Sequence, residues 1–228
     1  MIKDTFLKNK NIFVFIGLLL LIILPQALSA HVVTDLSKYS RTDVALIYLE
    51  LGFTHIIPLG IDHILFVLSL FFLNPKLKVV IWQATAFTVA HSITLGLAMY
   101  GLISPPTYII EPIIALSIMF VAIENIISNE LKPSRVLIVF GFGLIHGMGF
   151  ASALTNLGLQ QNQFVTSLLT FNLGVELGQL TIILLAWFLI GKWFYKESWY
   201  RNRIVIPISA VIAIVSLYWT IERTFFPS

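Results

Sequence analysis

The chain has 228 residues, of which 58% are hydrophobic and only 11% are charged, and its mean hydropathy is +0.93. A soluble domain usually carries about 25% charged residues, so this deficit excludes a soluble protein and indicates one integral membrane domain. The net charge of +3 is too small and too scattered to indicate a nucleic-acid-binding protein. Because there is no cysteine, any metal site must use imidazole, carboxylate, amide or main-chain groups, which suit Ni, Co, Zn or Mn.

The first thirty residues predict a secretory signal peptide. A start containing three lysines precedes an apolar core, Ile12–Leu24, and Pro25 ends that core shortly before Ala30. Cleavage after Ala30 would leave His31 as the mature N-terminus, and an uncleaved first helix is the alternative. The predicted parts are a cleavable signal peptide at 1–30, a periplasmic segment at 31–42 and a transmembrane helical domain at 43–228.

The remainder of the chain predicts an all-α, polytopic transmembrane helix bundle. A short amphipathic piece at 43–57, interrupted by Pro58 and Gly60, predicts an interfacial or re-entrant helix before the first full segment. Six apolar stretches follow, most of them near the roughly 20 residues that a bilayer requires. They are expected at about 59–73, 78–100, 107–128, 135–157, 163–190 and 204–221.

Alternating loop charges predict the orientation of these segments. The connections at 74–78, 129–135 and 191–203 contain Lys or Arg, whereas those at 101–106 and 158–162 contain neither. By the positive-inside rule the basic loops are cytoplasmic, which places the mature N-terminus and the C-terminus outside. A signal peptide requires the same orientation, so the expected location is a bacterial inner membrane. Two Gly-x-x-x-Gly pairs, Gly143/Gly147 and Gly174/Gly178, predict close helix packing.

Ionisable side chains lie inside these apolar stretches, where a charge at the helix centre costs about 2.5–3.5 kcal/mol on insertion scales. Such residues face a bundle interior or a water-filled path and pair with one another or with a ligand. Histidine with carboxylate is a usual ligand set for Zn, Ni or Co. The predicted metal ligands are Asp62, His63, His91, His146 and Glu176, with Asp62 either a ligand or a group that orients an imidazole. The alternative is a hydrogen-bond network that only holds helices together.

Further residues are candidates for the path that an ion would take. His55 reaches the same site if the chain folds back at Pro58 and Gly60, and is otherwise an interfacial histidine. Glu111 is either an entrance carboxylate or a helix-start residue, and Glu124 either ends the path or pairs with Lys132 or Arg135. The full set of candidate path residues is His31, where a free terminus could chelate metal, together with His55, Glu111, Glu124 and Asn172.

Five stretches resemble the HupE/UreJ family of bacterial membrane proteins. They are Gly60-Ile-Asp-His-Ile-Leu-Phe, Phe87-Thr-Val-Ala-His-Ser-Ile-Thr-Leu, Glu111-Pro-Ile-Ile-Ala-Leu-Ser, Phe142-Gly-Leu-Ile-His-Gly-Met-Gly-Phe-Ala and Phe171-Asn-Leu-Gly-Val-Glu-Leu-Gly-Gln. The resemblance implies a small permease associated with nickel supply to hydrogenase and urease, or with cobalt. Larger nickel/cobalt transporters carry His-x4-Asp-His, whereas the spacing from His55 is His-x6-Asp-His.

The preferred hypothesis is therefore a permease for a divalent transition metal ion, with Ni²⁺ or Co²⁺ first, rather than an enzyme. The expected partners are the lipid bilayer and the metal ion, which is substrate or bound ion, with no prosthetic group and no nucleic acid. The oligomeric state stays open, a homo-oligomer included. Two alternatives remain: an intramembrane zinc-dependent hydrolase of lipid or peptide, and a non-catalytic accessory protein for metalloenzyme assembly.

Overall fold

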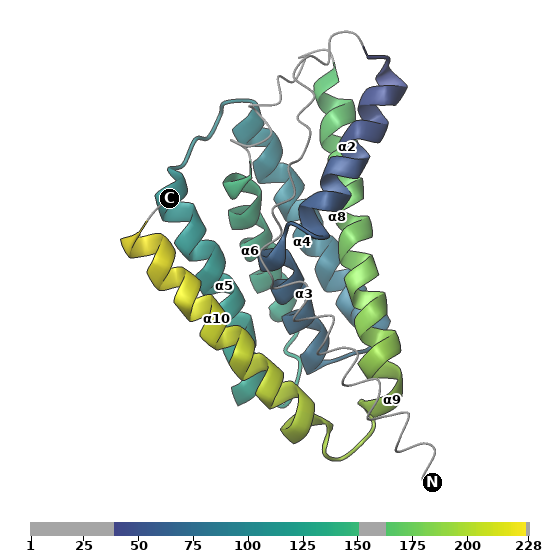
Figure 1. Cartoon of the computed structure of the whole chain (residues 1–228), viewed down its shortest axis with the longest axis vertical. Coiled ribbons are helices and arrows are strands. Elements are labelled where there is room, and N and C mark those ends of the chain that lie inside the picture. The colour runs from purple at the N-terminus through teal and green to yellow at the C-terminus, as the bar shows by residue number, and fades with distance from the viewer. Residues whose placement is uncertain (1–38, 151–162, 227–228) are drawn as a thin grey trace.

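The structure is a computed structural model that describes residues 39–150 and 163–226, and this part of the chain is helical without strands (Figure 1). The predicted signal peptide at 1–30, the segment at 31–38 and His31 lie outside the described residues. The helices are α2 (Arg41–Ile56), α3 (Ile61–Leu73), α4 (Leu77–Met99), α5 (Thr107–Ile127), α6 (Arg135–Gly149), α8 (Phe164–Ala186), the π-helical turn η3 (Trp187–Gly191), α9 (Lys192–Phe194), the π-helical turn η4 (Arg201–Val205) and α10 (Ile206–Phe225).

The all-helical membrane class is confirmed, and the described residues contain four helices that are long and apolar enough to cross a membrane. These are α4, α5, α8 with its continuation to Phe194, and the stretch from Arg201 to Phe225. The pair α2 and α3 passes the same test when taken together, although it bends by 67° at the break between them. Helix α6 is apolar but shorter, and the segment predicted at 135–157 is described only as far as 150. The described residues therefore support four or five spans, and the count of six stays a prediction.

Helix α2 begins at Arg41 because Ser40 and Asp43 form a capping box. The Ser40 hydroxyl accepts a hydrogen bond from the Asp43 amide, and the Asp43 carboxylate accepts one from the Ser40 amide. These two bonds satisfy amide groups that a helix start leaves without partners. The helix thus starts two residues before the amphipathic piece expected at 43.

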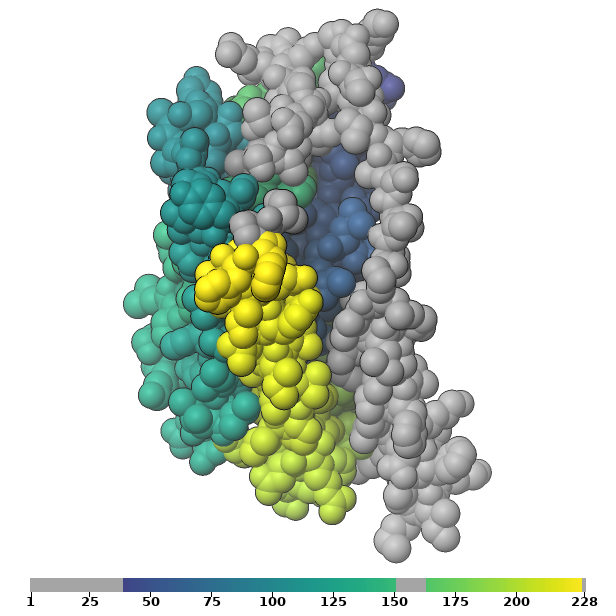
Figure 2. Space-filling view, turned by 60° about the vertical axis from the view of Figure 1, so that its left-hand side comes forward, coloured from purple at the N-terminus to yellow at the C-terminus, as the bar shows by residue number. Residues whose placement is uncertain are grey.

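Helix α3 forms the centre of the bundle. Every side chain from His63 to Phe72 is buried, because α4, α5 and α8 surround it and α10 and α2 touch it as well. A helix that is apolar on all sides is expected in such a position. Outside this centre, α2 packs mainly on α8, α4 on α6, and α10 on α5. Figure 2 shows α10 running beside α5 on the outside of the molecule.

Both predicted glycine pairs lie at close helix contacts. A Cβ on Gly174 would stand 2.2 Å from the Leu49 carbonyl oxygen, and one on Gly178 would stand 2.7 Å from the Ile56 Cβ, so this pair faces α2. A Cβ on Gly143 would stand 2.5 Å from the Phe87 carbonyl oxygen, so the other pair faces α4. Only glycine permits backbones to approach this closely. These contacts bring together the helices that carry the histidines.

Candidate metal centre

The break between α2 and α3 places two histidines side by side. His55 lies in the last turn of α2, and His63 lies in the first turn of α3, after Pro58 and Gly60. A Cβ on Gly60 would stand 2.1 Å from the His55 carbonyl oxygen, so the tight turn requires glycine here. The two imidazole centroids are 4.7 Å apart. The chain therefore folds back at Pro58 and Gly60, which is the condition for His55 to reach the same site as His63.

His91 on α4 completes a group that we call the histidine cluster: His55, His63 and His91. The His91 ring centroid lies 6.3 Å from that of His55 and 5.9 Å from that of His63. One ring nitrogen from each of the three residues lies within 4.8 Å of the other two. Ligand nitrogens about 2.0–2.1 Å from a common ion are separated by roughly 3–4 Å, so small ring movements would complete such a site.

The free nitrogens of the cluster have no hydrogen-bond partner among the described residues. The Nε2 atoms of all three histidines are buried and unpaired. Aromatic rings cover them, with the Phe150 centroid 3.9 Å from His55 and the Phe87 centroid 5.8 Å from His63. Buried polar atoms are normally hydrogen-bonded, so three unpaired nitrogens at one place call for a ligand.

Asn172 on α8 orients His91. Its amide nitrogen donates to the Leu168 carbonyl oxygen at 2.8 Å, and its Oδ1 lies 3.1 Å from His91 Nδ1. Because this oxygen can only accept, His91 Nδ1 carries the hydrogen and Nε2 keeps its lone pair. This is the arrangement in which a hydrogen-bond partner fixes the tautomer of a metal-ligating histidine. The expected path residue Asn172 therefore acts through His91.

His146 on α6 flanks the cluster. Its ring centroid is 5.1 Å from that of His63, and its Nε2 lies 3.0 Å from the Ser117 hydroxyl oxygen. The Ser117 hydroxyl donates to the Ile114 carbonyl oxygen at 2.7 Å, so His146 Nε2 must donate to Ser117. The lone pair then lies on Nδ1, which is buried without a partner. His146 is thus next to the three clustered residues, with a free nitrogen of its own.

Asp62 lies beside the cluster in sequence but pairs with the last helix. Arg223 donates from Nη1 to Oδ2 at 2.9 Å and from Nη2 to Oδ1 at 3.0 Å, and its guanidinium also stacks on Trp219. The same Nη1 donates to the main-chain oxygen of Glu111 at 3.4 Å. Both carboxylate oxygens of Asp62 are therefore used by a bidentate ion pair. A ligand role for Asp62 stays a prediction, in which the carboxylate would bind metal through lone pairs that Arg223 does not use.

Glu176 on α8 lies one helical turn beyond Asn172 and is held by hydroxyl groups. Thr85 donates to its Oε1 at 2.6 Å, and Thr88 donates to its Oε2 at 2.5 Å. Thr88 precedes His91 by three residues on α4, so Glu176 is about 5 Å along the bundle from the histidine cluster. The structure places this predicted ligand in an oxygen environment separate from the imidazoles.

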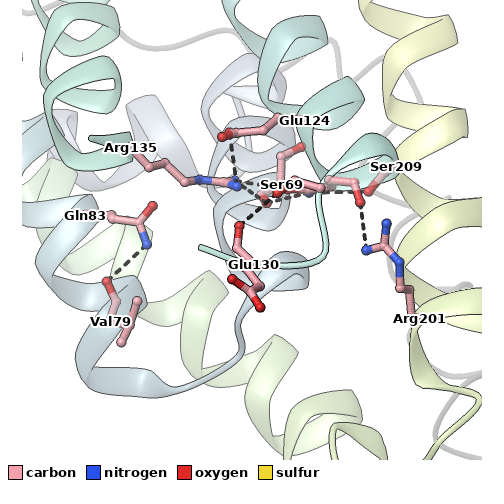
Figure 3. A network of polar contacts seen from close by, with 10 residues as sticks. Ser69, Val79, Gln83, Glu124, Glu130, Arg135, Arg201 and Ser209 are labelled. Carbon is pink, nitrogen blue, oxygen red and sulfur yellow. Dashed lines mark hydrogen bonds and ion pairs between the residues drawn. The ribbon is translucent and has the colours of Figure 1, made fainter. Parts of the chain in front are cut away.

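At the far end of the bundle, Glu124 pairs with Arg135, as the second reading of Glu124 predicted. Their side chains approach to 3.2 Å, and Arg135 also donates to Asn125 Oδ1 at 3.0 Å. Figure 3 shows these groups linking α3, α5, α6 and the start of α10. We call this set the Arg135 network: Ser69, Glu124, Asn125, Arg135, Arg201 and Ser209.

Several residues of the site could not be predicted from the sequence. Thr85, Thr88 and Ser117 are common in membrane helices and give no signal of their own. Arg223 does give one, because a charged residue in an apolar helix generally faces a partner. Its partner, however, is 161 residues away and cannot be read from spacing.

The fold and the site together define the class of protein. It is a helical membrane protein with converging imidazoles buried between its helices. The family model of the HupE / UreJ protein matches residues 30–223, so the chain belongs to the HupE/UreJ family. No curated protein and no solved structure matches the chain.

Proposed function

We propose that this protein is a permease that moves a divalent transition metal ion, Ni²⁺ or Co²⁺ first, across the bacterial inner membrane. The observation that carries the proposal is the convergence of His55, His63 and His91. Each offers one ring nitrogen within 4.8 Å of the others, and each has a buried Nε2 without a hydrogen-bond partner among the described residues. Neutral imidazole suits these ions. Membership of a family associated with nickel or cobalt transport, or with urease and hydrogenase maturation, supports the same reading.

The orientation in this proposal follows the loop charges. The connection between α3 and α4, the start of α6, and α9 lie toward one end of the bundle (Figure 1). These segments carry Lys76 and Lys78, Arg135 and Lys192, so the positive-inside rule makes this end cytoplasmic. The histidine cluster then lies nearer the outer face, and Glu176 lies on the way inward. Inward movement of a doubly charged ion through 100 mV gains about 4.6 kcal/mol, twice the value for one charge.

The acidic groups favour a permease over an intramembrane hydrolase. A zinc hydrolase needs an open position on the metal and a free general base next to it. Two carboxylates of the predicted metal set could serve as such a base, but both are engaged, Asp62 by Arg223 and Glu176 by Thr85 and Thr88. Polar groups instead continue along α4 and α8 from His91 to Glu176, as a route for an ion would.

Uptake of radioactive Ni²⁺ and Co²⁺ into cells tests the proposal. We expect His55→Gln, His63→Gln and His91→Gln each to reduce initial uptake about tenfold or more, because each removes one ligand nitrogen. His146→Gln should have a smaller effect, since that residue flanks the cluster. Leu169→Ala, on the exposed face of α8, is the matched control and should transport as the wild type does.

Equal uptake by the wild type, the three cluster variants and cells without the protein would overturn the permease proposal. The accessory alternative predicts a different pair of results. It predicts no uptake by the isolated protein in vesicles, but loss of hydrogenase or urease activity in cells that lack it.

A further inference from the structure

The oxygen environment of Glu176 contains more acceptors than hydrogens. Thr88 has one hydroxyl hydrogen, yet its Oγ1 lies 2.5 Å from Glu176 Oε2, 3.2 Å from the Ala84 carbonyl oxygen and 3.3 Å from Gln179 Oε1. A hydroxyl can donate to one acceptor at a time. At least two of these three oxygens are therefore not satisfied by Thr88 at any moment.

The carboxylate also lacks a counter-charge. No Lys, Arg or His side chain lies within ion-pair distance of Glu176 in the described parts of the chain. Glu124 and Asp62, by contrast, have Arg135 and Arg223. The histidines on α2, α3 and α4 gather one turn away and form no bond to it. An uncompensated carboxylate inside a membrane protein is costly, and such residues mark sites for ions.

Gln179 supplies a second indication. Its side chain is fully buried, its Oε1 faces Thr88, and its Nε2 has no hydrogen-bond partner among the described residues. In this orientation the amide oxygen shares the Thr88 hydroxyl with the Glu176 carboxylate. Because carbonyl, hydroxyl and carboxylate oxygens are the ligands of hard cations, Gln179 Oε1 adds one more oxygen ligand at this place.

We propose that Glu176, Thr88 and Gln179, with Thr85 and the Ala84 carbonyl oxygen around them, bind a small monovalent alkali cation. One carboxylate with neutral oxygens carries a single negative charge, so a monovalent ion gives a neutral complex. The donors are all oxygen, so this site and the histidine cluster select different ions although they lie one turn apart. In a transporter, such a site would hold a coupling ion. The inference itself concerns binding and does not rest on the proposed function.

Binding of ²²Na⁺ to the purified, full-length protein, with choline keeping the ionic strength constant, tests this site. We expect saturable binding that Glu176→Gln and Thr88→Val each weaken about tenfold or more, since each removes an oxygen ligand. Thr88→Ser retains the hydroxyl and should bind as the wild type does. Thr181→Val, on the same helix as Glu176 but with an exposed hydroxyl, is the matched control.

Three results would overturn the inference. They are a lack of saturable ²²Na⁺ binding, binding that Glu176→Gln and Thr88→Val leave unchanged, and sites that respond only to pH and not to Na⁺. Loss of binding in Thr88→Ser as well as in Thr88→Val would point to misfolding rather than ligand loss, and would likewise count against it. His63→Gln should leave Na⁺ binding intact, which separates this result from the fate of the proposed metal transport.

Discussion

The histidine cluster and the Arg135 network are both buried and polar, but the network pairs its charged groups with each other, whereas the Nε2 atoms of the histidine cluster have no partner among the described residues. In the Arg135 network, the charge of Arg135 faces Glu124 at 3.2 Å, and Asn125 Nδ2 donates to the Ser69 carbonyl oxygen at 2.7 Å. In the histidine cluster, the imidazoles lie next to one another and to phenyl rings, and no described residue forms a hydrogen bond with any of the three Nε2 atoms.

This difference distinguishes buried polar groups that stabilise the fold from buried polar groups that are available to a ligand. In the Arg135 network the Glu124 carboxylate and the Arg135 guanidinium form an ion pair, although Arg135 Nε and Ser69 Oγ are buried without a hydrogen-bond partner among the described residues. Removal of either charge should therefore damage the fold. No described residue bonds to the Nε2 atoms of the histidine cluster. Substitution of these histidines should therefore impair ligand binding and leave the fold intact. Substitutions in the two regions should therefore differ in how far they lower the free energy of unfolding.

Loss of Arg135 should have the largest effect. Arg135→Leu leaves the Glu124 carboxylate buried without its partner, which typically costs about 3–5 kcal/mol. The midpoint of thermal unfolding in detergent measures this loss. The double variant Glu124→Gln with Arg135→Leu should recover much of it, because no unpaired charge remains. Equal stability of Arg135→Leu and the wild type would show that the network does not hold the helices.

Two glycines on α6 provide a matched pair for the next prediction. Gly143→Ala would place a Cβ 2.5 Å from the Phe87 carbonyl oxygen and force α6 away from α4, at a cost of about 1–3 kcal/mol. Gly141→Ala meets no atom within 4 Å and should be neutral or stabilising by up to about 1 kcal/mol. Comparing the midpoints of thermal unfolding of the two variants tests this prediction. A loss of stability in both variants would mean that helix packing is not the cause.

Asp62→Asn should have a smaller effect on stability. It weakens the bidentate pair with Arg223, whose side chains are partly exposed, so we expect a loss of about 1 kcal/mol. Isothermal titration with Ni²⁺ then decides the predicted ligand role of Asp62. Unchanged affinity in Asp62→Asn would assign Asp62 to the ion pair alone, whereas a loss there and a gain in Arg223→Gln would assign it to the metal.

His63→Leu should have the smallest effect on the fold. The substitution removes a buried nitrogen without a partner, so stability should stay within about 1 kcal/mol of the wild type or rise. Addition of Ni²⁺ should raise the unfolding midpoint of the wild type but not that of His63→Leu, because ligand binding stabilises only the competent protein. A loss of stability as large as that of Arg135→Leu would show that the two regions contribute to the fold in the same way, and would contradict the account.

Much of this architecture could be predicted from the sequence, because composition and apolar length are local properties. The membrane class, the helix positions and the glycine contacts followed from residues close together in the chain. The convergence of His63 and His91 was expected from their rarity in apolar segments. The contribution of His55 depended on one bend, which Pro58 and Gly60 indicated but could not place in space.

The partners of the carboxylates could not be predicted, because they are distant in sequence. Asp62 meets Arg223 across 161 residues, and Glu176 meets Thr85 across 91. Each carboxylate has several candidate partners by charge, and only tertiary packing selects one. For that reason the sequence grouped Asp62 and Glu176 with the histidines, while the structure places each with another set of groups.

X-ray absorption spectroscopy of the purified protein loaded with one equivalent of Ni²⁺ tests the central claim most directly. The account predicts several imidazole ligands in the wild type, with one fewer in each of His55→Gln, His63→Gln and His91→Gln. A shell of oxygen ligands alone, or a spectrum that none of the three substitutions alters, would contradict it.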